Sequence, residues 1–251
     1  MTTLPAALEF LILAGAGFVA SILNVIAGGG SFLTLPLLIF FGLPAVEANA
    51  SNRLGVLAQN VGGVWGFHRH GILDWGWALR ATVPALAGAA FGTWMALRIG
   101  EQEFRRILAT LMIVVTLWTL FDRGGRLAAA FGGLRGRRVI LAVGFGLAGV
   151  YAGFIQAGVG FFILALTTVA GLDLVRGNAV KLLVILGTTL LSLGLFAWAG
   201  TVVWVPGLAL AVGSFGGSLV GVRLAVLKGH AWIRGVVTLA IVVFAVKLWL
   251  G

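Results

Sequence analysis

The sequence contains no cysteine and few charged residues. The absence of cysteine excludes disulfide bonds, thiolate metal sites and a cysteine nucleophile. Charged residues make up 10% of the 251-residue chain and hydrophobic residues 61%, whereas soluble proteins carry about 25% charged residues. Apolar runs close to the membrane-spanning length of about 20 residues recur from end to end. We therefore predict an all-α integral membrane protein with one transmembrane domain and no separate soluble domain.

Acidic residues are the second shortage. The sequence has only seven Asp and Glu but seventeen Lys and Arg, which gives a net charge of +10. Most basic residues lie in short gaps between apolar runs, where the positive-inside rule and anionic lipids explain them, so nucleic acid is not an expected partner. A carrier of cations would be expected to bury an acid opposite its substrate. All seven acids instead fall near predicted segment ends, which favours an anionic substrate: Glu9, Glu47, Asp74, Glu101, Glu103, Asp122 and Asp173.

The motifs of common enzyme classes are also missing. The stretch "GGGSF" lacks the Lys-Ser/Thr of a phosphate-binding loop, "GVGFF" lacks the third glycine of a dinucleotide fingerprint, and neither follows a strand. No paired acids, Ser-His-Asp set or metal-ligand cluster is recognisable. We therefore predict no catalytic residue, no metal and no cofactor.

Breaks between apolar runs divide the chain into ten segments. The second segment of each half is only half as long as the others, and the first is expected to be a retained helix rather than a cleaved signal. The predicted segments are 6–27, 31–41, 47–67, 77–99 and 104–121 in the first half, and 139–157, 161–170, 177–199, 203–227 and 232–250 in the second.

The two halves resemble each other in sequence. "GGGSFL" at Gly28 matches "GVGFFI" at Gly158, and "FRRILATLMIVV" from Phe104 runs beside "WIRGVVTLAIVV" from Trp232. Glycines, asparagines and arginines recur in the same order, which a shared apolar composition does not explain. We predict a duplication, with a first repeat at 1–122, a basic connector at 123–138 and a second repeat at 139–251.

Loop charge indicates how the repeats are oriented. If all five segments of each repeat cross the membrane, the loops on one side contain Arg69, Arg80, Arg176 and the basic connector. The loops on the other side contain Arg98 and Glu101. With four crossings a unit this asymmetry weakens. The positive-inside rule therefore favours inverted repeats, a cytoplasmic connector and both termini outside.

Each half-length segment begins after a glycine-rich break. A helix start offers unpaired N–H groups and a partial positive charge, and glycine lets an anion approach the backbone. Transporters with inverted repeats bind substrate near the midplane at such interrupted helices. Close packing between helices is the competing interpretation of the glycines.

A cation follows each half-length segment, a few residues after an Asn-Ala pair: Arg53 in the first half and Lys181 in the second. A charge at the bilayer centre costs roughly 2.5–3.5 kcal/mol on insertion scales, so two at equivalent positions suggest a function, with snorkelling to the interface as the alternative. Amides and hydroxyls nearby could share an oxyanion or join helices. The candidate substrate-binding residues are Asn24, Gly28, Gly29, Gly30, Ser31, Asn49, Ser51, Asn52, Arg53, Gln59, Asn60, Gln156, Gly158, Gly160, Asn178 and Lys181, with Thr188 alongside.

These motifs identify a family resemblance. "AGGGSFLTLPLLIFFGLP", "ANASNRLGVLAQN" and the later "AGVGFF" and "GLDLVRGNAVKLL" resemble the TauE/SafE sulfite exporter family, also called the toluene-sulfonate uptake permease family, over essentially the whole chain. The family's threonine-asparagine-lysine-like stretch looks like Ser51, Asn52 and Arg53 here. Arginine replaces the usual lysine, Val180 stands where a hydroxyl is common, and members are often drawn with eight spans.

The resemblance implies a secondary transporter of small sulfur-containing anions, either organosulfonates such as sulfoacetate or sulfite. The alternatives are a passive anion channel and an intramembrane enzyme. The expected location is the bacterial cytoplasmic (inner) membrane, crossed several times. Expected partners are the anionic substrate, membrane lipids and, as one option, a second copy of the chain in a homodimer.

Overall fold

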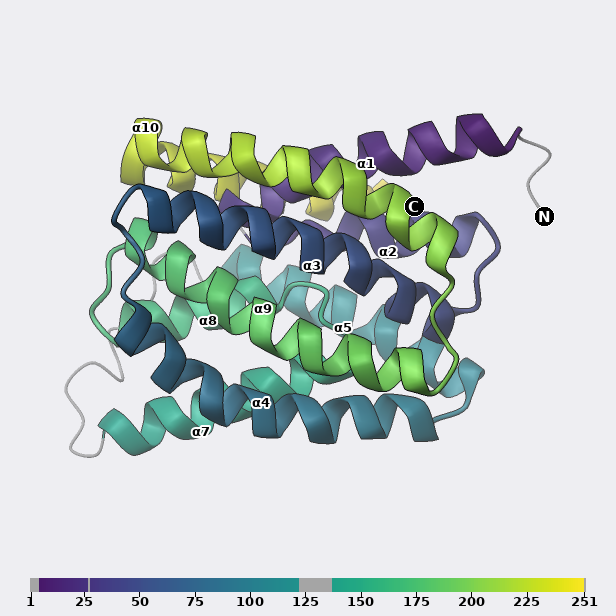
Figure 1. Ribbon diagram of the computed structural model, residues 1–251, viewed down its shortest axis with the longest axis horizontal. Helices are drawn as coiled ribbons and strands as arrows, with labels where there is room; N and C mark the ends of the chain where they lie inside the picture. Colours follow the sequence, from purple (N-terminus) through teal and green to yellow (C-terminus); the bar gives the residue numbers. More distant parts are fainter. Residues whose placement is uncertain (1–4, 27, 122–136, 251) are drawn as a thin grey trace.

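The computed structural model describes residues 5–26, 28–121 and 137–250, and helices make up nearly all of them (Figure 1). No strand occurs in these ranges. The helices are α1 (Ala6–Ile26), α2 (Ser31–Phe40), α3 (Ala45–Arg69), α4 (Trp75–Arg98), α5 (Glu101–Phe121), α7 (Arg137–Phe154), α8 (Val159–Val169), α9 (Leu174–Trp198) and α10 (Trp204–Leu250). The predicted all-α fold is confirmed, while most of the predicted connector lies outside the described residues.

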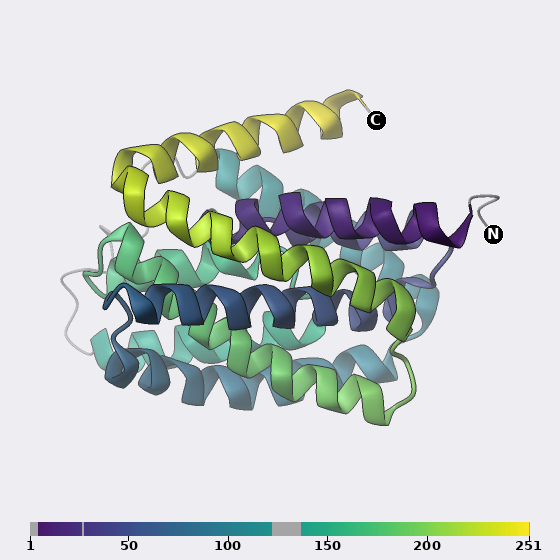
Figure 2. The same ribbon diagram turned by 45° about the horizontal axis from the view of Figure 1, so that its top comes forward.

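The last two predicted segments form one helical element in the structure. Residues 203–227 and 232–250 were expected as separate helices, and α10 covers both. Its ribbon nevertheless doubles back on itself (Figure 2), so its two parts run in opposite directions. The difference from the prediction is the missing gap in helical structure and not the path of the chain.

Each short helix packs antiparallel on the long helix that follows it. α2 is antiparallel to the start of α3, because Thr34 of α2 donates a hydrogen bond to Asn52 of α3 and the chain then turns from one helix into the other. At 1.5 Å a residue, the ten residues of α2 span about 15 Å, so α2 begins about halfway along α3. α8 packs back on α9 in the same way, where Gly177 faces Thr167. In Figure 1, α1 and α7 run inward from the ends of the bundle at which α2 and α8 finish, so each half-length segment completes a hairpin that enters and leaves at the same end.

The direction of the helices divides the loops between the two ends of the bundle. α3 runs from right to left in Figure 1 and α9 from left to right. This places Arg69, Arg80 and Arg176 at one end and Arg98 and Glu101 at the other, which is the division that the charge argument uses. Each half-length segment counts as a crossing in the charge argument. A hairpin returns the chain to its starting side just as two full crossings do, so the division of loop charges between the two sides is unchanged. The duplication itself stays a prediction.

The closest helix pairs join opposite halves of the chain. α1 packs on α10 and α4 packs on α7, with glycines where the backbones touch. A Cβ on Gly213 would lie 1.7 Å from the Ala14 carbonyl oxygen, and one on Gly92 would lie 2.0 Å from that of Val150. Small residues of this kind let membrane helices pack tightly. We call α1, α2, α3 and α10 the first bundle and α4, α7, α8 and α9 the second bundle; α3 and α9 lie against each other between them.

Among the residues that the structure describes, three helical stretches are long and apolar enough to cross a membrane: Ala6–Ile26, Leu174–Trp198 and Trp204–Leu227. α3 has the length but carries polar and charged side chains along its buried faces. It lies inside the helix assembly, where other helices shield those side chains from lipid. This burial of a polar helix leads to the candidate site.

Candidate anion-binding site

The two glycine-rich turns meet at the centre of the protein. A Cβ on Gly28 would lie 2.7 Å from the carbonyl carbon of Gly160, and one on Gly160 would lie 2.5 Å from the Cα of Gly28. Gly28 and Gly158 have φ angles of +99° and +77°, which favour glycine. Close backbone contact, the competing interpretation of these glycines, is therefore present in the structure. On the side where a Cβ would point, the opposite turn already fills the space at Gly28 and Gly160.

Part of the backbone at the turns is already hydrogen-bonded. The Gly30 N–H donates to Asn24 Oδ1 at 3.4 Å, and the Phe161 N–H donates to the Gly158 carbonyl oxygen at 3.1 Å. These two N–H groups were expected to face the anion. Asn24 instead helps to hold the first turn together, because its side chain reaches across the break in the helix.

Lys181 of α9 reaches across to the end of α1. Its Nζ donates to the carbonyl oxygens of Asn24 at 2.8 Å and Val25 at 3.0 Å, and to Asn178 Oδ1 at 2.6 Å. Asn178 Nδ2 donates to the Ile26 carbonyl oxygen at 3.3 Å. The last carbonyls of a helix lack partners within it and carry partial negative charge. Lys181 and Asn178 therefore cap the interrupted helix of the opposite half.

Arg53 and Asn49 of α3 make the corresponding contacts with the end of α7. Arg53 Nη2 donates to the Gly153 carbonyl oxygen at 2.6 Å, and Asn49 Nδ2 donates to that of Phe154 at 2.9 Å. The Arg53 guanidinium also lies over the ring of Phe196, with 4.9 Å from Cζ to the ring centroid. In each half, an asparagine and a cation thus hold the last carbonyls of the other half's broken helix.

Arg53 keeps unused donors although its side chain is 0% exposed. Its Nε and Nη1 atoms have no hydrogen-bond partner in the described part of the chain. Two further buried amide nitrogens on α3, Asn52 Nδ2 and Gln59 Nε2, also lack a partner there. Buried donors without partners are costly, so a ligand or ordered water that accepts from them would stabilise this region.

The remaining polar candidates are also buried, but their contacts differ. Asn52 Oδ1 accepts from Thr34 Oγ1 at 2.6 Å, and Ser51 Oγ accepts from the Val203 N–H at 2.8 Å. Asn60 donates to the Val56 carbonyl oxygen one turn earlier, at 2.6 Å. Ser51 thus fixes the start of α10, while the oxygens of Asn49 and Asn60 have no partner among the described residues.

Gln156 lies just after the end of α7 and has a φ angle of +66°, uncommon for a residue other than glycine. Its Nε2 donates to Thr189 Oγ1 of α9, and its Oε1 has no partner in the described ranges. The side chain is therefore turned into the protein at the second break. Thr188 is also buried, but its hydroxyl bonds the carbonyls of Val184 and Ile185 on its own helix.

Two hydroxyl residues belong to this region that the sequence did not single out. Thr93 Oγ1 of α4 lies 2.7 Å from Ser192 Oγ of α9 and 3.2 Å from the Gly153 carbonyl oxygen that Arg53 also contacts. Both hydroxyl residues are 0% exposed. Neither lies near a glycine break in the sequence, so only the packing of α4, α7 and α9 reveals them. A buried hydroxyl in an apolar helix is a weak signal, because it can bond its own backbone.

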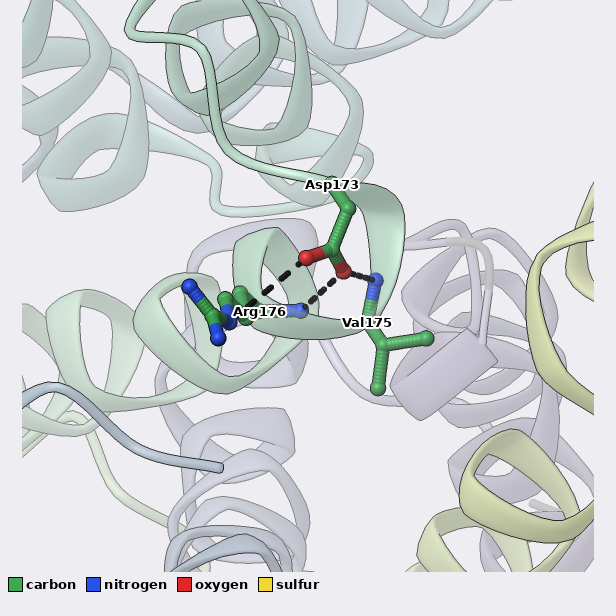
Figure 3. A network of polar contacts seen from close by, with 3 residues as sticks. All are labelled: Asp173, Val175 and Arg176. Atoms are coloured by element: carbon green, nitrogen blue, oxygen red, sulfur yellow. Dashed lines mark hydrogen bonds and ion pairs between the residues drawn. The ribbon is translucent and has the colours of Figure 1, made fainter. Parts of the chain in front are cut away.

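The two helices that carry the cations begin at carboxylate caps. Asp173 Oδ1 accepts from the N–H groups of Val175 at 2.9 Å and Arg176 at 3.0 Å at the start of α9 (Figure 3). α3 begins after Pro44 without a side-chain cap of its own, and the Glu101 carboxylate accepts from its first N–H groups instead. A carboxylate at a helix N-terminus is favourable. Glu101 therefore ties the start of α5 to the helix that carries Arg53.

No carboxylate approaches the buried cations within the described ranges. The one ion pair found there joins Arg176 and Asp173 at the surface, at 3.6 Å, and Figure 3 shows it beside the helix cap. No group of three His, Asp or Glu side chains in the same ranges could hold a metal ion. The site thus combines two buried cations with amides and hydroxyls, and an anion is the ligand that this composition suits.

Comparison with known proteins agrees with the resemblance in the sequence. The model of the family described as "Sulfite exporter TauE/SafE" matches residues 13–248. The chain belongs to this family. It is therefore a membrane transport protein, and the family match includes both glycine breaks, Arg53 and Lys181.

Curated relatives of this TauE/SafE protein carry names that agree with transport. "Probable membrane transporter protein ORF9" of Sinorhizobium is 27% identical over 96% of this chain and 92% of its own length. A "Probable membrane transporter protein" of Haemophilus influenzae is 29% identical over 92% of this chain and 91% of its own. "Probable membrane transporter protein YfcA" of Escherichia coli K12 is 29% identical over 95% and 87%. No solved structure matches the chain.

Proposed function

We propose that this protein is a secondary transporter of small sulfur-containing anions, either organosulfonates such as sulfoacetate or sulfite, in the bacterial cytoplasmic membrane. Transport is the activity named for the family and for its relatives. The sulfur-containing substrate comes from the family description together with the chemistry of the site.

The observation that carries the proposal is the pair of fully buried cations without a carboxylate partner in the described chain. Burying a charge in an apolar interior is unfavourable unless opposite charge or strong hydrogen bonds compensate it. Lys181 has the carbonyls of α1 for this purpose, whereas no described residue accepts a hydrogen bond from Nε or Nη1 of Arg53. Sulfonate and sulfite oxygens are strong acceptors that match the planar guanidinium.

Transport further requires that the site open to each side in turn. We propose that the two halves are inverted repeats and that the first bundle moves against the second. The capping contacts of Arg53 and Lys181 run between the two bundles, so they are the polar contacts that such a movement would strain or remake. With a cytoplasmic connector, the end of the bundle with Arg69 and Arg176 faces the cytoplasm.

A flux measurement tests the proposal. The purified protein is reconstituted into proteoliposomes, and uptake of labelled sulfoacetate and sulfite is followed with empty liposomes as the background. We expect saturable uptake that unlabelled substrate competes away. Absence of uptake for every sulfonate and for sulfite would reject the proposal. Currents in a planar bilayer too large for a carrier would identify a passive channel instead, and chemical conversion of the anion would identify an enzyme.

A further inference from the structure

The two buried cations occupy corresponding places but use their donors differently. The Lys181 ammonium has three protons and three acceptors: the carbonyl oxygens of Asn24 at 2.8 Å and Val25 at 3.0 Å, and Asn178 Oδ1 at 2.6 Å. The Arg53 guanidinium has five N–H bonds but, in the described ranges, one hydrogen-bonded acceptor, the Gly153 carbonyl oxygen. Of the two cations, therefore, Arg53 is the one with donors that no described residue fills.

The acceptors of Lys181 also account for its charge. Asn24 and Val25 belong to the last turn of α1, where the free carbonyls form the negative end of the helix dipole. A cation at this position is stabilised by the helix itself and needs no bound anion. Because the Gly28 turn follows directly after α1, the lysine also fixes the place where the first turn contacts Gly160.

Arg53 is instead held in place as a preorganised anion-binding residue. The Phe196 ring lies against its guanidinium, and the Gly153 carbonyl oxygen fixes Nη2. The Thr93 hydroxyl lies 3.2 Å from the same carbonyl oxygen and 2.7 Å from the Ser192 hydroxyl, so both hydroxyls belong to the same polar region. A guanidinium held on one side, with Nε and Nη1 unpartnered in the described part of the chain, suits a small oxyanion that offers several oxygens.

We propose that Arg53 alone of the two cations binds the transported anion, and that Lys181 is a positioning residue that caps α1 and holds the first glycine turn. This division of roles rests on the proposed function. It replaces the symmetric expectation that both cations neutralise the substrate. It also places the anion nearer to the end of α7 than to the contact between the two glycine turns.

Four variants of the full chain separate the roles. Arg53→Gln removes the guanidinium, Lys181→Met removes both donors and charge, and Lys181→Gln keeps a neutral donor. Arg98→Gln is the control, because Arg98 is an exposed cation at the end of α4 that lies near an aromatic ring, with 5.5 Å from its Cζ to the ring centroid of Trp94. Each purified variant is unfolded thermally in detergent, without ligand and with sulfite or sulfoacetate titrated in, since a ligand of the folded state raises the unfolding temperature.

We expect opposite patterns. Arg53→Gln lowers the ligand-free unfolding temperature less than Lys181→Met does, because it removes one hydrogen bond to the protein against three. It binds the anion roughly tenfold to a hundredfold more weakly, as expected for lost charge-assisted hydrogen bonds. Lys181→Met lowers the ligand-free unfolding temperature, and Lys181→Gln recovers part of it. In proteoliposomes Lys181→Gln lowers the maximal rate at an unchanged KM, whereas Arg53→Gln raises KM. Lys181→Gln also carries the test if Lys181→Met does not fold.

Two results would overturn the division of roles. One is that Arg53→Gln and Lys181→Gln lose anion binding equally while Lys181→Gln keeps the ligand-free stability of the wild type. Both cations would then bind the anion. The other is wild-type anion binding by Arg53→Gln. Failure of the proposed function differs from both, because the wild-type protein itself would then show neither a ligand-induced shift nor uptake.

Discussion

The contact between the two glycine turns leads to a quantitative prediction. Gly28 combines a φ angle of +99° with close contact, since a Cβ there would lie 2.7 Å from the carbonyl carbon of Gly160. Gly42 has a similar φ angle of +95°, but a Cβ there would have no atom within 4 Å. Gly160 has the close contact without a left-handed backbone, with 2.5 Å from its Cβ to the Gly28 Cα. Alanine at these three positions therefore separates backbone strain from overpacking.

The expected losses of unfolding free energy follow from these geometries. Gly42→Ala should cost about 1–2 kcal/mol, the penalty of the left-handed conformation for alanine. Gly160→Ala should cost about 1–3 kcal/mol from overpacking against backbone that cannot turn away. Gly28→Ala carries both penalties and should cost roughly 2–5 kcal/mol. Unfolding in mixtures of SDS and a mild detergent, followed by circular dichroism, measures all three.

The comparison with Gly42 decides whether the reasoning holds. Gly194→Ala serves as a second control, because a Cβ on that glycine also meets no atom within 4 Å. If Gly28→Ala were no more destabilising than Gly42→Ala, the two turns would not be in tight contact in the folded protein. Anion uptake by Gly28→Ala and Gly160→Ala should fall as well, since each pushes the broken helices apart beside the Arg53 and Lys181 caps.

Two further predictions concern contacts outside the turns. Asp173→Ala should lower the unfolding free energy by about 0.5–2 kcal/mol through loss of the α9 cap, and Glu101→Ala should destabilise the start of α3 in the same way. Unfolding in mixed detergents measures both variants. Unchanged stability would contradict the capping role. Thr93→Val should cost about 1 kcal/mol because it removes the hydroxyl that bonds Ser192, whereas Thr110→Val, at an exposed position of α5, should cost less in the same measurement.

Much of the fold could be predicted because lipid imposes simple rules. Apolar runs of membrane-spanning length and glycine breaks located the helices, and the short α2 and α8 lie within a few residues of their predicted bounds. The prediction was less successful at α10, where one helical element covers two predicted segments. The predicted gap between these segments, residues 228–231, is short and contains few helix breakers, so the local sequence does not require an interruption of helical structure.

The candidate site was only partly predictable. Arg53, Lys181 and their asparagines stand out because charges and amides are rare in apolar helices, and the structure places all four at the ends of broken helices. Whether a donor is free or already bonded depends on what the opposite half presents to it. Thr93 and Ser192 bond each other although they lie about a hundred residues apart in sequence, and Glu101 caps α3, which precedes it by about fifty residues. Local sequence gives no sign of such contacts.

By itself the sequence determined that this is a helical membrane protein of the TauE/SafE family, with two glycine breaks and two cations in apolar surroundings. These properties follow from composition and local pattern, which need no knowledge of partners. The tertiary structure decided that the turns touch each other and that each cation caps the opposite half's broken helix. It also distinguished Lys181, whose donors are filled, from Arg53, whose Nε and Nη1 have no partner among the described residues, because hydrogen bonding between distant segments exists only once the helices have packed.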